Sequence, residues 1–108
     1  MTDLGPPKRY QEIKAKYPDI LDAYEKLSSA TKKAGPLDEK TVALIKLGIS
    51  IGARAEGATH SAVRKALKAG ASPEEIRHAV FLSTTTIGFP NMMAALSWAD
   101  DILEKTGE

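Results

Sequence analysis

The sequence has 108 residues and contains no cysteine. This absence excludes disulfides, thiolate metal ligands and every thiol-based redox reaction. No apolar run approaches the ~20 residues that a membrane-spanning helix needs, and the first ten residues lack the apolar segment of a secretory signal. There is also no excess of one charge, because 15 Lys and Arg face 14 Asp and Glu. We therefore expect a cytoplasmic protein whose partners include neither nucleic acid nor a membrane.

What is present is a composition typical of one small globular domain, with 43% hydrophobic and 27% charged residues. Between the glycines and prolines, apolar residues recur with helical spacing, which predicts an all-α bundle of about six helices. We place them at residues 9–16, 18–33, 38–53, 54–70, 73–87 and 90–103. Residues 1–36 are expected to pack as N-terminal helices on a core domain of residues 37–105, which gives one structural domain overall.

One helix start is marked by Ser72, Pro73 and Glu75. A serine cap, a proline at the first helical position and a glutamate three residues after the serine form the pattern of a capping box. The predicted helices at 38–53 and 73–87 are apolar on nearly every side. Because a small domain leaves much of its surface in contact with water, this excess of apolar surface predicts an obligate homo-oligomer.

The segment 54–70 carries the candidate chemistry. On a helical wheel, Glu56 and His60 lie four residues apart on the same apolar face as Val63 and Leu67. A carboxylate beside an imidazole fixes the tautomer of the ring and raises its basicity, as a general base requires. The simpler interpretation is a partly buried histidine that makes one hydrogen bond. The contact becomes looser if the helix begins only after Gly57.

Two other groups are candidates for a supporting role at such a site, the Arg54 guanidinium and a hydroxyl of the threonine run, represented by Thr85. No metal ion and no other cofactor is expected. A zinc site usually needs three or four ligands, and the second imidazole, His78, falls on a face predicted to be solvated.

Three stretches resemble one known family. They are Leu37-Asp38-Glu39-Lys40-Thr41, the string from Ala66 to Ile76 (ALKAGASPEEI), and Gly88-Phe89-Pro90 followed by Ala94-Ala95. They are similar to the carboxymuconolactone decarboxylase family, which includes the AhpD-like alkylhydroperoxidases. The resemblance covers residues 37–103. It implies an AhpD-like all-α fold and assembly into homotrimers or hexamers.

The resemblance also indicates what this chain cannot do. Family members with peroxidase activity use two cysteines, a histidine and a glutamate, and this sequence has alanine at all four positions: Ala55, Ala58, Ala62 and Ala43. Thiol peroxidase activity is therefore excluded. The decarboxylase branch keeps a histidine and a glutamate four residues apart at two of these positions, whereas here Glu56 and His60 keep that spacing but are displaced by two residues.

Two hypotheses about function remain open. In the first, Glu56 and His60 carry out non-redox acid–base catalysis or bind a small molecule, and the resemblance implies a lyase like carboxymuconolactone decarboxylase. In the second, the chain is a non-catalytic oligomeric module whose site has degenerated. The expected partners are further copies of the chain and, in the first case, a small-molecule ligand.

Overall fold

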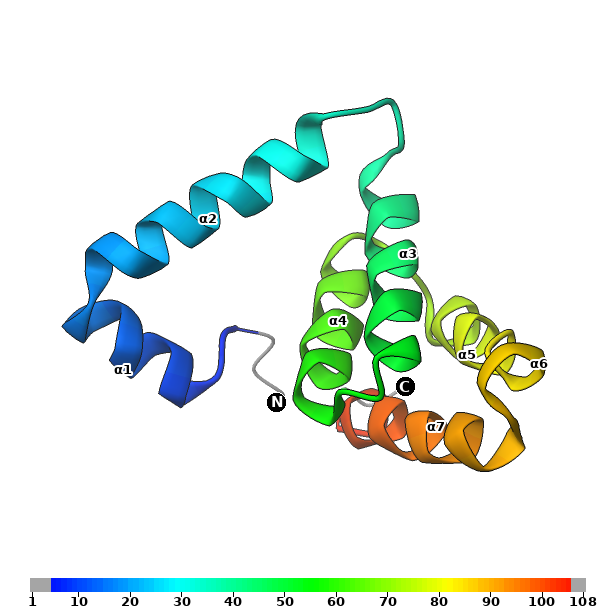
Figure 1. The fold of residues 1–108 in the computed structure, drawn as a ribbon. Helices are drawn as coiled ribbons and strands as arrows, with labels where there is room; N and C mark the ends of the chain where they lie inside the picture. Colours follow the sequence, from blue (N-terminus) through cyan, green and yellow to red (C-terminus); the bar gives the residue numbers. More distant parts are fainter. Residues whose placement is uncertain (1–4, 106–108) are drawn as a thin grey trace. The chain divides into compact units, whose positions relative to one another are not determined.

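The structure is a computed structural model, and it describes residues 5–105. Within these residues every regular element is a helix, which confirms the predicted all-α class. The helices are α1 (Lys8–Lys16), α2 (Pro18–Lys33), α3 (Glu39–Gly52), α4 (Glu56–Lys68), α5 (Pro73–Phe81), α6 (Thr84–Ile87) and α7 (Phe89–Leu103), as Figure 1 shows. None of these helices has the length and hydrophobicity needed to cross a membrane. The cytoplasmic location stays a prediction.

The chain divides into two compact units, and the division falls between Asp38 and Glu39. This boundary lies two residues after the predicted one. The first unit holds α1 and α2, and the second holds α3 to α7. The expected packing of the N-terminal helices on the rest of the chain stays a prediction.

In the first unit, α1 and α2 are joined through the Glu25 carboxylate. The Tyr10 hydroxyl donates to Glu25 Oε2 over 2.6 Å, and Lys14 Nζ lies 2.9 Å from Oε1. The hydrogen bond to this carboxylate raises the pKa of Tyr10 to about 12, and the same bond lowers the pKa of Glu25. Neither helix has a buried residue. The side-chain bonds that join α1 and α2 are therefore polar, and this unit has no buried hydrophobic core of its own.

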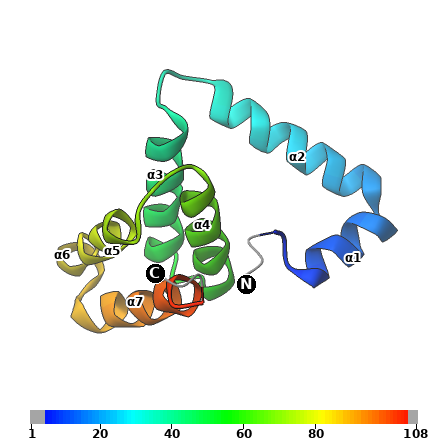
Figure 2. The same ribbon diagram turned by 180° about the vertical axis from the view of Figure 1, so that it is seen from behind.

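The second unit has one hydrophobic core. Helices α3 and α4 lie side by side in both ribbon views, and α7 packs on α4, α5 and α6 (Figures 1 and 2). Hydrophobic residues with at most 1% of their surface exposed come from four of these helices: Leu47, Ile51, Val63, Ala66, Ile76, Val80, Ala95, Ala99 and Leu103. The spacing of three or four residues within each helix is that of one buried stripe per helix.

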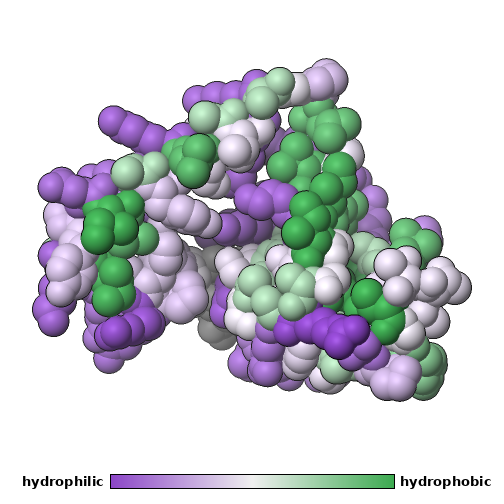
Figure 3. All heavy atoms as spheres, in the orientation of Figure 1, coloured by the Kyte–Doolittle hydropathy of each residue, from purple (hydrophilic) through white to green (hydrophobic). Residues whose placement is uncertain are grey.

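Helix α3 is apolar on nearly every side but buries only one stripe, formed by Ala43, Leu47 and Ile51. On the opposite side, Ile45 and Ile49 remain 47% and 64% exposed. Figure 3 shows hydrophobic side chains gathered along α3 on the visible face. The excess of apolar surface expected from the sequence is therefore present on this chain.

The prediction of one continuous helix over 73–87 is wrong. Helix α5 ends at Phe81, and the short helix α6 begins at Thr84. At the break, Ser83 Oγ donates to the Val80 carbonyl and Thr84 Oγ1 donates to the Phe81 carbonyl, both over 2.7 Å. Side-chain hydroxyls that bond to carbonyls of the preceding turn compete with the regular helical pattern. These two hydroxyl bonds accompany the break in the helix.

Other boundaries differ from the prediction by one or two residues. Helix α1 starts at Lys8 instead of residue 9, α3 starts at Glu39 instead of residue 38, and α4 spans Glu56–Lys68 instead of 54–70. Helix α3 ends at Gly52 instead of residue 53, and α7 starts at Phe89 instead of Pro90. Gly88 precedes α7 with a φ of 93°, a backbone conformation that side chains with a Cβ rarely adopt. This turn gives α7 its start and leaves Pro90 within the first helical positions, where no backbone N–H is needed.

The predicted capping box at the start of α5 is confirmed. Ser72 Oγ accepts from the Glu75 backbone N–H, and the Glu75 side chain accepts from the Ser72 N–H. Glu75 also accepts a hydrogen bond from Lys40 Nζ over 2.9 Å, which ties α5 to α3. The Lys40 bond first, and the Ser72 N–H second, lower the pKa of Glu75 below its ordinary value of 4.5.

This lowered pKa predicts an acid-dependent loss of stability. Because the folded state holds Glu75 ionised more strongly than the unfolded state, its contribution is complete above pH 4.5 and is lost as the pH falls through the folded pKa. Glu75→Gln keeps a side chain suited to the capping box but removes the charge. In urea denaturation series, the variant should lose less unfolding free energy on acidification than the wild type. Glu74→Gln is the matched control and should behave as the wild type does.

Candidate functional site

The centre of the candidate site is a contact between α4 and α7. His60 Nε2 lies 3.0 Å from Asp101 Oδ2. The His60 side chain is 22% exposed and that of Asp101 is 51% exposed, so the contact lies at the edge of the protein surface. The structure therefore pairs the predicted His60 with the Asp101 carboxylate, which lies 41 residues further along the chain.

Glu56 completes a cluster of three groups. Helix α4 begins at Glu56 itself, so Glu56 and His60 do lie one helical turn apart in the same helix. One carboxylate oxygen of Glu56, one ring nitrogen of His60 and one carboxylate oxygen of Asp101 all lie within 4.8 Å of one another. Glu56 is exposed, so it approaches the pair from the solvent side. We call these three residues the His60 cluster.

Packing of α4 against α7 holds this cluster in place. Thr59 and Val63 flank His60 in α4, and neither has any exposed surface. On α7, Ile102 and Leu103 follow Asp101 directly and are buried as well. Because these neighbours are buried, the backbone has little freedom in the turn of α4 that carries His60 and in the turn of α7 that carries Asp101. The apolar residues around the cluster thus determine which side chains of the two helices meet.

The arrangement supports proton transfer. A carboxylate acceptor favours the tautomer in which His60 donates from Nε2, and the lone pair then lies on Nδ1. The same three groups offer one nitrogen and two oxygen atoms to a cation. This possibility was not expected from the sequence, which predicted no metal site.

Asp101 was missed in the sequence analysis. It stands in the last turn of α7 next to Asp100, and its neighbours in the sequence do not indicate a contact with α4. Their neighbours in the fold separate them, because Asp100 forms an ion pair of 2.9 Å with Arg77 of α5 while Asp101 faces His60. No local sequence pattern indicates which partner each aspartate has, since this depends on how α7 crosses α4 and α5.

The two supporting residues do not join the cluster. Arg54 is exposed in the turn between α3 and α4, with a φ of 56° that is uncommon for a residue with a side chain. Thr85 is exposed on α6. Among the described residues, neither makes a hydrogen bond or ion pair with the cluster. Glu56 and His60 are thus the two predicted site residues that the structure brings together.

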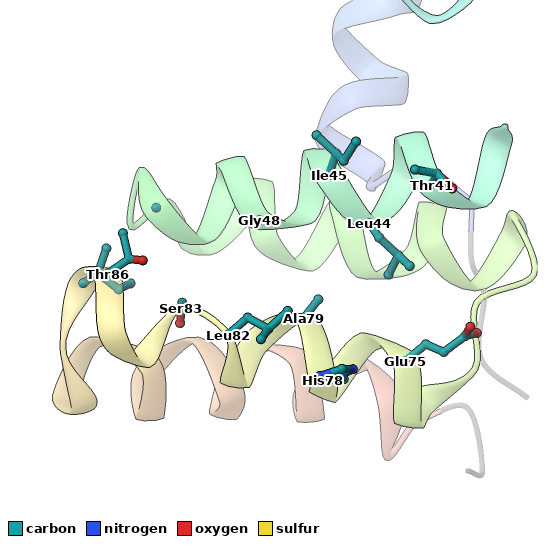
Figure 4. Close-up of a pocket in the computed structure, with 12 residues that line it drawn as sticks. Thr41, Leu44, Ile45, Gly48, Glu75, His78, Ala79, Leu82, Ser83 and Thr86 are labelled. Carbon is teal, nitrogen blue, oxygen red and sulfur yellow. The ribbon is translucent and has the colours of Figure 1, made fainter. Parts of the chain in front are cut away.

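A separate apolar groove runs between α3 on one side and α5 and α6 on the other (Figure 4). Its volume is about 530 Å³. Leu44 points from α3 toward α5, while Glu75 and Thr86 lie toward opposite ends. His78, predicted on a solvated face, is exposed but lines this groove. The full lining is Thr41, Leu44, Ile45, Gly48, Gly52, Glu75, His78, Ala79, Leu82, Ser83, Thr86 and Ile87. The groove is therefore distinct from the His60 cluster.

The four alanines at the family's redox positions have different environments. Ala43 on α3 and Ala62 on α4 are buried in the core. Ala55 is half-buried just before α4, and Ala58 is exposed on α4. Ala62, where the family carries histidine, thus lies deeper in the fold than His60. The displaced pair occupies a different side of α4 from the positions of the family site.

Comparison with known proteins gives a consistent picture. The family model for the carboxymuconolactone decarboxylase family matches residues 18–101. The chain is 34% identical over 94 residues to an uncharacterized protein, MJ0742, of Methanocaldococcus jannaschii, and the match covers 86% of each chain. No solved structure gives a significant match.

The partial exposure of the His60–Asp101 pair leads to a prediction about stability. Ion pairs exposed to this degree contribute about 0–1 kcal/mol, so Asp101→Ala should lower the free energy of unfolding by no more than that. Val63→Ala removes two methyl groups from a fully buried position and should cost about 2 kcal/mol. Urea denaturation measures both. A loss in Asp101→Ala as large as that in Val63→Ala would show that the pair is a structural element.

Proposed function

Because the chain belongs to the carboxymuconolactone decarboxylase family, we propose that it carries out non-redox acid–base chemistry on a small molecule at the His60 cluster. The observation that supports this proposal is the 3.0 Å contact between His60 Nε2 and Asp101 Oδ2. It joins a proton-transfer group to the carboxylate that orients it, in a position that a small molecule can reach from solvent. The complete absence of cysteine separates this chemistry from that of the thiol peroxidases.

Each residue of the cluster has a proposed role. His60 takes or gives the proton at Nδ1, while Asp101 holds the ring through Nε2 and is a positioning residue. Glu56, the exposed carboxylate, stabilises the imidazolium that forms when the ring accepts a proton. In a decarboxylation, the carbon–carbon bond to the carboxylate breaks, CO₂ leaves with the carboxylate oxygens, and the remaining carbon receives the proton from the imidazolium.

The lyase reaction that names the family provides the direct test. The purified chain is incubated with carboxymuconolactone, and the release of CO₂ is followed. His60→Gln should lower the rate by about a hundredfold or more, because general acid–base catalysis contributes at least that much. Asp101→Asn should lower kcat more than it changes KM, since Asp101 acts on the ring and not on the substrate. His78→Gln changes the second imidazole, which lies in the groove, and serves as the matched control.

The outcomes separate the proposal from its alternative. Full turnover in His60→Gln, or an equal loss in His78→Gln, contradicts the assigned roles. Absence of turnover by the wild type, together with no binding of the lactone, favours the second hypothesis, a non-catalytic oligomeric module. The observation that favours this second function is the replacement of all four residues of the family's redox site by alanine.

We also propose that copies of the chain associate through the groove between α3 and α5. Ile45 on α3 and Leu82 after α5 border this groove and are 47% and 65% exposed. A Cβ added at Gly48 or Gly52 would meet no atom within 4 Å, so a second chain can approach α3 closely there. Exposed apolar surface on a helix that is apolar on nearly every side is typical of an interface between copies. Trimers and hexamers are the expected assemblies.

A charge placed in the groove tests this association. Leu82→Glu should shift the mass measured by light scattering toward that of a single chain, because the glutamate loses water without gaining a partner. The change should leave the helical circular dichroism signal intact, since Leu82 is exposed within the chain itself. Ser97→Glu adds the same charge at an exposed position of α7 outside the groove and should keep the wild-type mass. An unchanged mass in Leu82→Glu would rule out this interface.

A further inference from the structure

We propose that Glu56, His60 and Asp101 together bind one divalent transition-metal ion of the Zn²⁺ or Co²⁺ class. The three groups come from two helices and offer one ligand atom each, and these atoms lie within 4.8 Å of one another. One imidazole nitrogen and two carboxylate oxygens form a donor set suited to such ions. Three protein ligands leave further positions for water or another small ligand.

The distance between the His60 and Asp101 ligand atoms requires only a small movement. Two atoms that bind one tetrahedral ion at about 2.0–2.2 Å lie about 3.4 Å apart. His60 Nε2 and Asp101 Oδ2 are 3.0 Å apart, so they need to separate by a few tenths of an ångström. Glu56 has a flexible side chain in the first turn of α4, and it is exposed, so its carboxylate is free to turn toward the ion.

Electrostatics at the end of α7 also favour a cation here. Asp101 stands in the last turn of α7, where the helix dipole is negative, and this turn holds two aspartates but no basic side chain. Asp100 already pairs with the Arg77 guanidinium of α5. Asp101 instead faces an imidazole, which is an excellent metal ligand in its neutral form. A carboxylate at this helix end is stabilised by a bound cation for the same reason that lysine is favoured there.

Buried neighbours hold the backbone on both sides of the site, while the side chains of His60 and Asp101 are accessible from solvent. Thr59 and Val63 have no exposed surface on either side of His60, and Ile102 and Leu103 anchor the turn of Asp101. The ligand-bearing turns are therefore held before an ion arrives, which reduces the entropy lost on binding. The ring of His60 is 22% exposed and the side chain of Asp101 is 51% exposed, so the ion has direct access from water.

Metal binding also regulates the proposed chemistry, and this consequence rests on the proposed function. An ion bound at Nε2 replaces the proton there, and a neutral ring then carries its proton on Nδ1. Nδ1 no longer has the lone pair with which the proposed base accepts a proton.

The experiment uses the full chain without an affinity tag. Co²⁺ is added while its visible absorption is recorded, and Zn²⁺ binding is measured by calorimetry. We expect one ion per chain. Loss of a metal ligand should weaken affinity at least as much as loss of a group that only orients a ligand, so His60→Ala, Asp101→Ala and Glu56→Gln should each bind about tenfold more weakly or worse. Circular dichroism confirms that the variants are folded.

Two matched controls lie outside the cluster. His78→Ala removes the other imidazole, and Asp100→Asn removes the neighbouring carboxylate, so both should bind Co²⁺ as the wild type does. Failure of the wild type to bind either ion at millimolar concentration overturns the proposal. So does equal binding by the cluster variants, or an equal loss in His78→Ala. Because no substrate is present, this result is independent of turnover, and metal binding without lactone turnover would contradict only the proposed function.

Discussion

Burial of α4 against α7 is the constraint on which the candidate site depends. Val63 and Ala66 in α4 meet the core together with Ala99 and Leu103 of α7, and none of the four has any exposed surface. Alanine on both helices permits close approach of the backbones, because almost no side chain separates them. The contact between His60 and Asp101 is a consequence of this approach. A polar pair at the edge of such an interface is positioned by apolar packing and contributes little to stability itself.

The sequence predicts the helices well and their junctions less well. Helical spacing of apolar residues indicates the bundle, and the capping box at Ser72 places the start of α5 at the observed residue. The break between α5 and α6 was missed because apolar residues continue through it with helical spacing. At the break, two hydroxyl groups bond to the Val80 and Phe81 carbonyls, and helical periodicity does not detect such bonds.

The candidate site was predicted only in part, because sequence spacing detects a contact within one helix but not a contact between two helices. Glu56 and His60 lie within one helix, so their spacing alone places them one turn apart. Asp101 lies 41 residues from His60 in the sequence, and only the crossing of α7 over α4 brings it to the ring. The groove was not predicted either, because its walls belong to α3, α5 and α6, and the sequence of one helix does not indicate which others it faces.

A displacement of two residues along α4 has large effects on chemistry. A shift of two residues along an α-helix turns a side chain by about 200° around the axis. A histidine at the position of Ala62 would therefore lie on a different side of α4 from His60. Ala62 is 7% exposed and belongs to the core, whereas His60 reaches the surface beside α7. The loss of the family's thiol site and the presence of the His60 cluster are thus separate features of one helix.

The nitrogen atoms of His60 link the two proposals for the cluster. Proton transfer at Nδ1 needs Asp101 to accept a hydrogen bond from Nε2, and metal binding needs Nε2 and Asp101 to share an ion. Both states use the same packing of α4 on α7 and the same two side chains, but they place the ring proton on opposite nitrogens. The two states therefore exclude each other within one chain. If both proposals hold, the concentration of free divalent metal would decide which state is populated, since binding to one state shifts the population away from the other.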